Sequence, residues 1–103
     1  MTCNVTHHMP IVSFEHRGLA AFWTQGSKAG IQPEHASRLR IRLDALNAVT
    51  GESDVLALPR GWRRHQHVGR GRGRWSIDVS GNWRLTFELR GGNVALLDYT
   101  DPH

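Results

Sequence analysis

Cysteine and lysine are scarce in this chain of 103 residues. The single cysteine, Cys3, cannot form an internal disulfide, which fits a reducing compartment. Only one of the 13 basic residues is a lysine, so the other twelve are arginines. Long apolar runs are missing too: none approaches the roughly 18 residues of a membrane-spanning helix. Because the N-terminus also lacks the pattern of a signal peptide, we expect a soluble, cytoplasmic protein with no membrane partner.

The remaining composition suits one small globular domain. Apolar residues make up 39% of the chain, which is enough for a single modest core. Residues 1–10 show no periodicity and end at Pro10. We therefore predict a disordered leader over residues 1–10 and one domain over residues 11–103.

Positive charge is concentrated in one stretch of the chain. The formal net charge is +4, from 13 basic and 9 acidic residues. Guanidinium groups match phosphate oxygens two at a time, so clustered arginines indicate a polyanionic partner such as RNA, DNA or an acidic protein. A solvated basic loop with no specific partner is the alternative. Residues 60–74 contain no acid and hold six arginines: Arg60, Arg63, Arg64, Arg70, Arg72 and Arg74.

The first half of the chain has the residue spacing of helices. Apolar residues three and four apart predict one helix over residues 17–25 and a second from Pro33 to about Val49. Residues 11–15 are rich in β-forming side chains and are predicted to be a short strand. Residues 51–61 contain proline and glycine and are predicted to be a loop.

The second half has the alternation of strands. Glycine and asparagine between the last three strand candidates are typical of hairpin turns, so these strands should pair antiparallel. The predicted fold class is α+β, in which two helices from the N-terminal half pack on a mainly antiparallel sheet of four to five strands. The strand candidates are residues 63–68, 75–80, 83–89 and 94–99.

Three stretches of the sequence together resemble a known family. Residues 13–50, residues 73–89 with their Gly-Asn-Trp-Arg turn, and residues 96–103 with their terminal Asp-x-His are similar to HigB-type toxins. These are the killer proteins of plasmid-maintenance systems, within the RelE superfamily. The similarity covers residues 11–103 and implies a compact RelE-like domain. It also implies a type II toxin that cleaves messenger RNA on the ribosome, as a metal-independent endoribonuclease with no cofactor, and so inhibits translation.

The same resemblance implies a set of partners. A HigA-type helix-turn-helix antitoxin would hold the toxin inactive. The ribosome and its messenger RNA would be the target. Operator DNA would be contacted only through the antitoxin.

Carried over residue by residue, the resemblance assigns four catalytic positions. The family's catalytic histidine falls on His65, its phosphate-binding arginine on Arg84, and its terminal acid and histidine on Asp101 and His103. Metal-free RNA cleavage needs a base for the ribose 2′-hydroxyl, an acid for the 5′-oxygen and cations for the phosphorane charge. Imidazole groups exchange protons near neutral pH, so either histidine can be base or acid. The arginine can hold phosphate oxygens, and the aspartate can orient a histidine or act as base.

Two positions depart from the family pattern. The family's lysine, three residues after the histidine, is Val68 here, and its penultimate tyrosine is Pro102. Both changes remove groups that can contact a phosphate or a base, so we predict a slow enzyme. Arg70 or Arg72 is expected to substitute in part for the lysine. The residues predicted to bind RNA are Arg63, Arg70, Arg72 and Arg74.

Two further functions stay open from the sequence. The departures leave open, as an alternative to the ribonuclease, a catalytically weakened homologue that serves as an antitoxin-binding and operon-regulating module. The same fold also serves ParE-type gyrase inhibitors, although the retained histidines and arginine favour RNA cleavage. A zinc site at His65 and His67 lacks further ligands at motif spacing, so no metal is expected.

Overall fold

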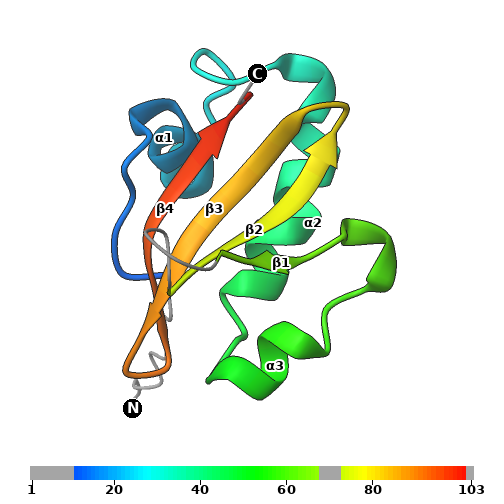
Figure 1. Cartoon of the computed structure of the whole chain (residues 1–103). Coiled ribbons are helices and arrows are strands. Elements are labelled where there is room, and N and C mark those ends of the chain that lie inside the picture. Colours follow the sequence, from blue (N-terminus) through cyan, green and yellow to red (C-terminus); the bar gives the residue numbers. More distant parts are fainter. Residues whose placement is uncertain (1–10, 68–72, 102–103) are drawn as a thin grey trace.

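A four-stranded antiparallel sheet, in the order β1-β2-β3-β4, organises the chain in the computed structural model. The structure describes residues 11–67 and 73–101. Among these residues, the two longest helices lie together behind the sheet and leave its front face without a helix (Figure 1). This arrangement confirms the α+β class. The elements concerned are α1 (Arg17–Gln25), α2 (Ala36–Leu46), β1 (His65–Gln66), β2 (Arg74–Ser80), β3 (Trp83–Arg90) and β4 (Asn93–Thr100).

The core lies between the helices and the back of the sheet. Side chains alternate between the two faces of a strand, so β2 and β3 each present one apolar row toward α1 and α2. Burying each large apolar side chain contributes about 1.5–3 kcal/mol. The buried rows of the two strands consist of Trp75, Ile77, Val79, Leu85 and Phe87, and the helices contribute Leu19, Phe22, Leu39, Leu43 and Leu46.

Local sequence signals set the ends of both helices. The His16 ring Nδ1 accepts a hydrogen bond from the Leu19 backbone N–H at 2.9 Å, and Gly26 ends α1 in the left-handed region with φ 75°. The prediction for this helix is confirmed. The second begins as a 3₁₀ turn, η1 (Pro33–His35), and ends at Leu46, three residues earlier than predicted. No helix in the described ranges has the length and hydrophobicity needed to cross a membrane.

The predicted loop over residues 51–61 is wrong. It contains a short helix, α3 (Glu52–Leu56), and a 3₁₀ turn, η2 (Arg60–Trp62). The Asp54 carboxylate accepts hydrogen bonds from the backbone N–H and the hydroxyl of Thr50, and these bonds also lower the pKa of Asp54. Val55 is fully buried. A capping contact and one core side chain thus form a helix too short to show periodicity.

Two predicted strands are shorter in the structure. Residues 11–15 form only isolated bridges, parallel to β4, from Ile11 to Val94 and from Phe14 to Leu97. Within the described part of residues 63–68, only β1 is a strand, because Arg63 has a left-handed backbone with φ 52°. The predicted leader, residues 1–10, lies outside the described residues.

Two glycines allow α1 to touch the loop that follows it. A Cβ atom on Gly18 would lie 2.4 Å from the backbone oxygen of Gly30, and one on Gly30 would lie 2.5 Å from the Gly18 Cα. Both contacts are with backbone atoms, so no side chain can move aside. The close approach therefore requires glycine at both positions.

We expect Gly18→Ala to lower the free energy of unfolding by about 1–3 kcal/mol, because displacing packed backbone outweighs the gain of about 1 kcal/mol in helix propensity. Urea denaturation measures the difference. Gly61→Ala is the matched control, since a Cβ there meets nothing within 4 Å. Equal stability of the two variants would contradict the close contact.

Candidate active site

The helix-free face of the sheet, called the outer face below, is lined by polar side chains. Residues directly opposite each other in an antiparallel pair point to the same face. The strand register therefore places one residue of each strand in a single row: His65, Ser76, Thr86 and Asp98. The histidine is exposed and lies at the β1 end of this row.

A second row of the outer face holds the predicted phosphate-binding residue. Arg84 pairs with Asp78 on one side and with Thr100 on the other. One strand separates Arg84 from His65, so their Cα atoms lie about 10 Å apart across the sheet and about 7 Å along it. Asp101 follows the end of β4, next to Thr100, and is exposed. Arg84 and Asp101 thus lie near one end of the sheet, and His65 lies on the outer face two residues along the strands from the Arg84 row.

Asp78 lies between two arginines. Its Oδ2 is 3.5 Å from Arg63 Nε, and its Oδ1 is 3.8 Å from Arg84 Nε. The Arg84 Nε is buried and makes no hydrogen bond to any residue that the structure describes, whereas the side chain as a whole is 40% exposed. The ion pair holds this guanidinium at the sheet surface, where its exposed part can bind an anion.

Arg42 reaches the same position from α2. Its Nε donates to the Asp78 backbone oxygen at 2.8 Å, beyond the end of the short β1, and its guanidinium lies over the Trp62 ring at 4.7 Å. Burial lowers the pKa of Arg42, and so does neighbouring Arg38, while Asp78 raises it. The contact satisfies a carbonyl that no neighbouring strand covers.

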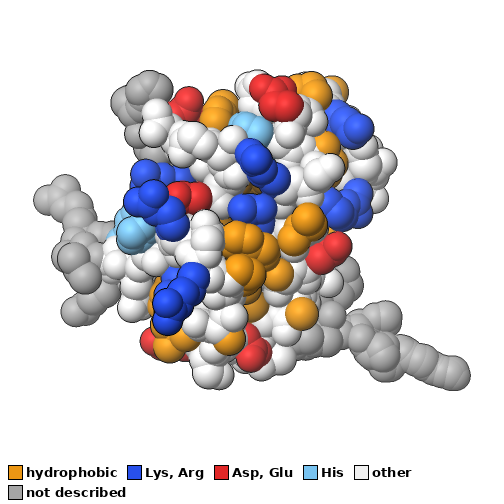
Figure 2. Space-filling view, turned by 90° about the vertical axis from the view of Figure 1, so that its right-hand side faces the viewer, with side chains coloured by type: hydrophobic (Ala, Val, Ile, Leu, Met, Phe, Trp, Pro, Cys, Tyr) orange, Lys and Arg blue, Asp and Glu red, His pale blue; other side chains and the backbone are white. Residues whose placement is uncertain are grey.

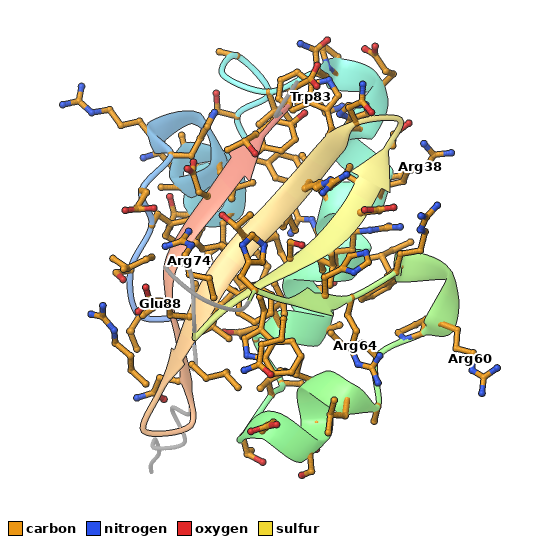
Figure 3. The ribbon with its side chains drawn as sticks, viewed as in Figure 1. Arg38, Arg60, Arg64, Arg74, Trp83 and Glu88 are labelled. Carbon is orange, nitrogen blue, oxygen red and sulfur yellow. The ribbon has the colours of Figure 1, made fainter. Side chains whose placement is uncertain are left out.

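Arg74, one of the predicted RNA-binding arginines, lies within a strand and contacts several side chains. It is the first residue of β2, and it donates to the Thr86 hydroxyl at 2.9 Å. It also forms ion pairs with Glu15 at 3.6 Å and with Glu88 at 3.5 Å, and Figure 3 labels Arg74 and Glu88. Its proposed role in RNA binding must compete with these partners. Five other positions singled out from the sequence lie outside the described residues: Val68, Arg70, Arg72, Pro102 and His103.

Arginines also surround the β1 side of the molecule. In Figure 2 basic side chains border an apolar patch on this side. Arg38 and Arg60 are exposed and point away from the sheet (Figure 3). This side adjoins the outer face through Arg63, whose side chain is 72% exposed. A polyanion bound to the outer face therefore meets further positive charge at the sheet edge.

An aromatic cluster fixes the end of β4. The Tyr99 ring stacks on Trp83 with centroids 4.6 Å apart, and its hydroxyl lies 2.7 Å from Nδ1 of the buried His35. Burial raises the pKa of Tyr99, which keeps its hydroxyl protonated at neutral pH. The cluster anchors the strand that Asp101 follows, so Trp83 has a structural role.

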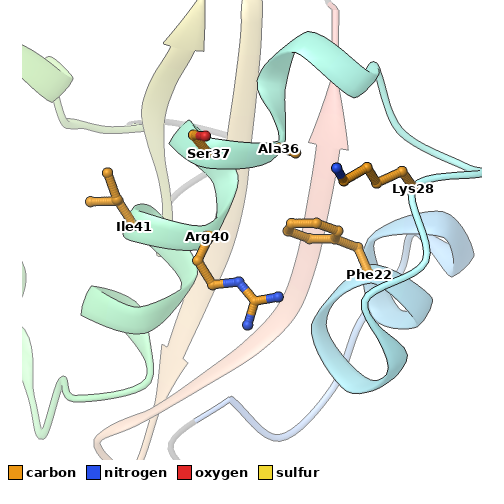
Figure 4. A pocket seen from close by; sticks show the side chains of 6 residues that line it. All are labelled: Phe22, Lys28, Ala36, Ser37, Arg40 and Ile41. Atoms are coloured by element: carbon orange, nitrogen blue, oxygen red, sulfur yellow. The ribbon is translucent and has the colours of Figure 1, made fainter.

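A separate hollow of about 420 Å³ lies between α1 and α2, on the helix side of the sheet. Figure 4 shows Phe22, Lys28 and Arg40 around this hollow, and the Arg40 guanidinium lies 5.2 Å from the centre of the Phe22 ring. It belongs to the face opposite His65 and Arg84. Within the described ranges, no group of three or more His, Cys, Asp or Glu side chains is placed to hold a metal ion.

Sequence reasoning missed Asp78, Arg42 and Ser76. Asp78 had a readable signal, because it lies opposite Arg84 across the predicted turn and alternates with buried residues of the same strand. The sequence signal for Arg42 was limited to its position on the basic edge of the second predicted helix. The position of Ser76 opposite His65 depends on a strand register that no turn signal fixes.

Comparison with known proteins agrees with the resemblance seen in the sequence. Residues 12–103 match the family of HigB-like toxins, described as the RelE-like toxin of type II toxin-antitoxin system HigB. A curated relative, Endoribonuclease HigB of Proteus vulgaris, is 34% identical over 94 residues. The match covers 90% of this chain and 99% of that relative.

We expect Arg42→Ala to lower the free energy of unfolding by about 1–3 kcal/mol, because it removes the bond to the Asp78 carbonyl and the contact with Trp62. Arg38→Ala removes the same charge from the same helix and should change stability by less than about 0.5 kcal/mol. Chemical denaturation of both variants distinguishes the edge contact from a general charge effect. Similar losses of stability in both variants would contradict a specific contribution of the Arg42 contact at the sheet edge.

Proposed function

The chain belongs to the HigB family of RelE-like toxins from type II toxin-antitoxin systems, and we propose from this that it is an endoribonuclease that cleaves messenger RNA on the ribosome. The observation that carries the proposal is the outer face, where His65 and Arg84 share an open polar surface. The named activity of the Proteus vulgaris relative supports the reaction class.

In the proposed reaction the ribose 2′-oxygen attacks the adjacent phosphorus. The O2′–P bond forms, the P–O5′ bond breaks, and a 2′,3′-cyclic phosphate remains on one fragment. His65 exchanges a proton with one of the two oxygens, and His103 or Asp101 serves the other. Arg84 binds the non-bridging oxygens, where negative charge grows in the transition state.

The partners follow from the family and from the charge distribution. An antitoxin is the expected protein partner of a toxin in a type II system, and we propose a HigA-type helix-turn-helix protein that alone contacts operator DNA. Exposed arginines at the β1 side support binding to ribosomal RNA, since phosphate contacts release counterions. We therefore propose a cytoplasmic location, where both of these partners would be found.

A second candidate function rests on the two departures from the family. Val68 lacks the charge of the family's lysine, and Pro102 lacks the ring and hydroxyl of its tyrosine. A homologue without useful cleavage would still bind its antitoxin and contribute to operon control. Measured cleavage distinguishes this candidate from the first.

We expect His65→Ala to abolish growth inhibition and to reduce ribosome-dependent cleavage by about 10²–10⁴-fold, because it removes a proton carrier. Mapping messenger RNA 5′ ends after induced expression, and single-turnover assays with and without ribosomes, measure this. His67→Ala is the matched control, another exposed histidine two residues further along the chain. Cleavage of naked RNA at the ribosomal rate would contradict ribosome dependence. A DNA-damage response with continued translation would favour gyrase as the target.

We expect Val68→Lys combined with Pro102→Tyr to raise ribosomal cleavage, because one restored electrostatic donor can be worth about 10²–10³ in rate. The parent should cleave slowly, and the double variant should be more toxic at equal expression. Lys28→Val in the otherwise parental chain is the control. It removes a positive charge far from the outer face and so tests whether charge at such a distance changes the cleavage rate. An unchanged rate in the double variant would show that these positions are not the family's lysine and tyrosine.

A further inference from the structure

Ser76 is buried on the outer face beside an exposed histidine. Only 1% of its surface is exposed, and its hydroxyl has no hydrogen-bond partner among the described residues. Leaving a buried hydroxyl unpaired costs free energy, so such a group calls for an explanation. Its neighbours in the row differ in this respect: the Thr86 hydroxyl accepts from Arg74, and Asp98 Oδ1 accepts from the Tyr99 backbone N–H.

His65 is the cross-strand partner of Ser76. The register pairs the two residues directly, and the bond from His67 N–H to the Arg74 carbonyl at 2.8 Å continues the same ladder. Cβ atoms of directly opposed residues lie about 5 Å apart on one face. The serine Oγ is one bond from its Cβ and the imidazole Nδ1 is two bonds away. Rotation of the histidine side chain therefore brings these two atoms within hydrogen-bond distance.

We infer that Ser76 is a positioning residue for His65, with its Oγ accepting a hydrogen bond from the imidazole Nδ1–H. This inference rests on the proposed role of His65 in RNA cleavage. If Nε2 faces the RNA, it gives or takes the proton during the reaction, whether the histidine acts as base or as acid. Nδ1 keeps its proton in both cases, so a hydrogen-bond acceptor beside Nδ1 can hold the ring throughout the reaction.

The bond has two physical consequences. It selects the Nδ1–H tautomer of the neutral ring, whereas free histidine favours the Nε2–H tautomer. It also restrains the ring of an exposed side chain on a strand of only two residues. Both effects direct the Nε2 lone pair away from the sheet, toward the space in front of Arg84.

The test compares Ser76→Ala with Ser80→Ala, the same substitution on the same strand. We expect Ser76→Ala to lower the single-turnover rate of ribosomal cleavage about tenfold, the value of one lost hydrogen bond, and Ser80→Ala to leave the rate unchanged. Ser76→Thr, which keeps the hydroxyl, should retain most of the rate. The unfolding free energy of Ser76→Ala should change little, because the loss of one bond to an exposed side chain is offset by the removal of a buried hydroxyl.

The ¹⁵N chemical shifts of the neutral His65 ring give a readout independent of activity. We expect the parent and Ser76→Thr to be enriched in the Nδ1–H tautomer, and Ser76→Ala to shift toward Nε2–H. An unchanged tautomer in Ser76→Ala overturns the inference, even if the rate falls. A parent that shows the Ser76-dependent tautomer without cleaving RNA supports the contact and overturns the proposed function instead.

Discussion

The burial of one face of the β2–β3 hairpin against α1 and α2 is the constraint on which the rest of the structure depends. Side chains in a strand alternate, so burying Trp75, Ile77 and Phe87 decides which residues face outward. A register slip of one residue would turn Asp78 and Arg84 into the core, where unpaired charges cost several kcal/mol. The apolar residues thereby specify the core and the outer face at once.

Charge balance on the outer face follows from that arrangement. Asp78 contacts Arg63 and Arg84 through its carboxylate and Arg42 through its backbone oxygen. The three arginines and the one aspartate together carry a net charge of +2. Without the carboxylate, mutual repulsion would drive the guanidinium groups apart into solvent. With it, they stay close together and can still attract a phosphodiester, which brings one negative charge.

Strong local patterns made much of the fold predictable. The α1 bounds follow from an apolar stripe and a terminating glycine, and β2, β3 and β4 lie within one residue of prediction because alternation and turn residues agree. α3 escaped prediction because its formation depends on the Thr50–Asp54 contact and on burial of Val55. The parallel bridges of residues 11–15 depend on β4, about 80 residues later, which no local signal can reveal.

The candidate site was less predictable than the fold. His65 and Arg84 came from a family resemblance, not from spacing, and nothing local joins them. Their common face became visible only when the register was known. Ser76 looks like an ordinary polar strand residue in the sequence. Its burial and its position opposite His65 are tertiary properties.

The distribution of ion pairs also bears on our proposal that an arginine takes over the role of the lysine that Val68 replaces. Arg74 is engaged by Glu15, Glu88 and Thr86, and its side chain is only 25% exposed. The side chain of Arg63 is 72% exposed, and its one ion pair among the described residues is a long contact of 3.5 Å with Asp78. It precedes His65 by two residues and reaches the row that contains Arg84. An exposed ion pair of this kind is worth at most about 1 kcal/mol, so a phosphate at His65 can compete for Arg63 far more easily than for Arg74. Among the described arginines, Arg63 therefore has the best position to add a second cation to the charge that Arg84 supplies.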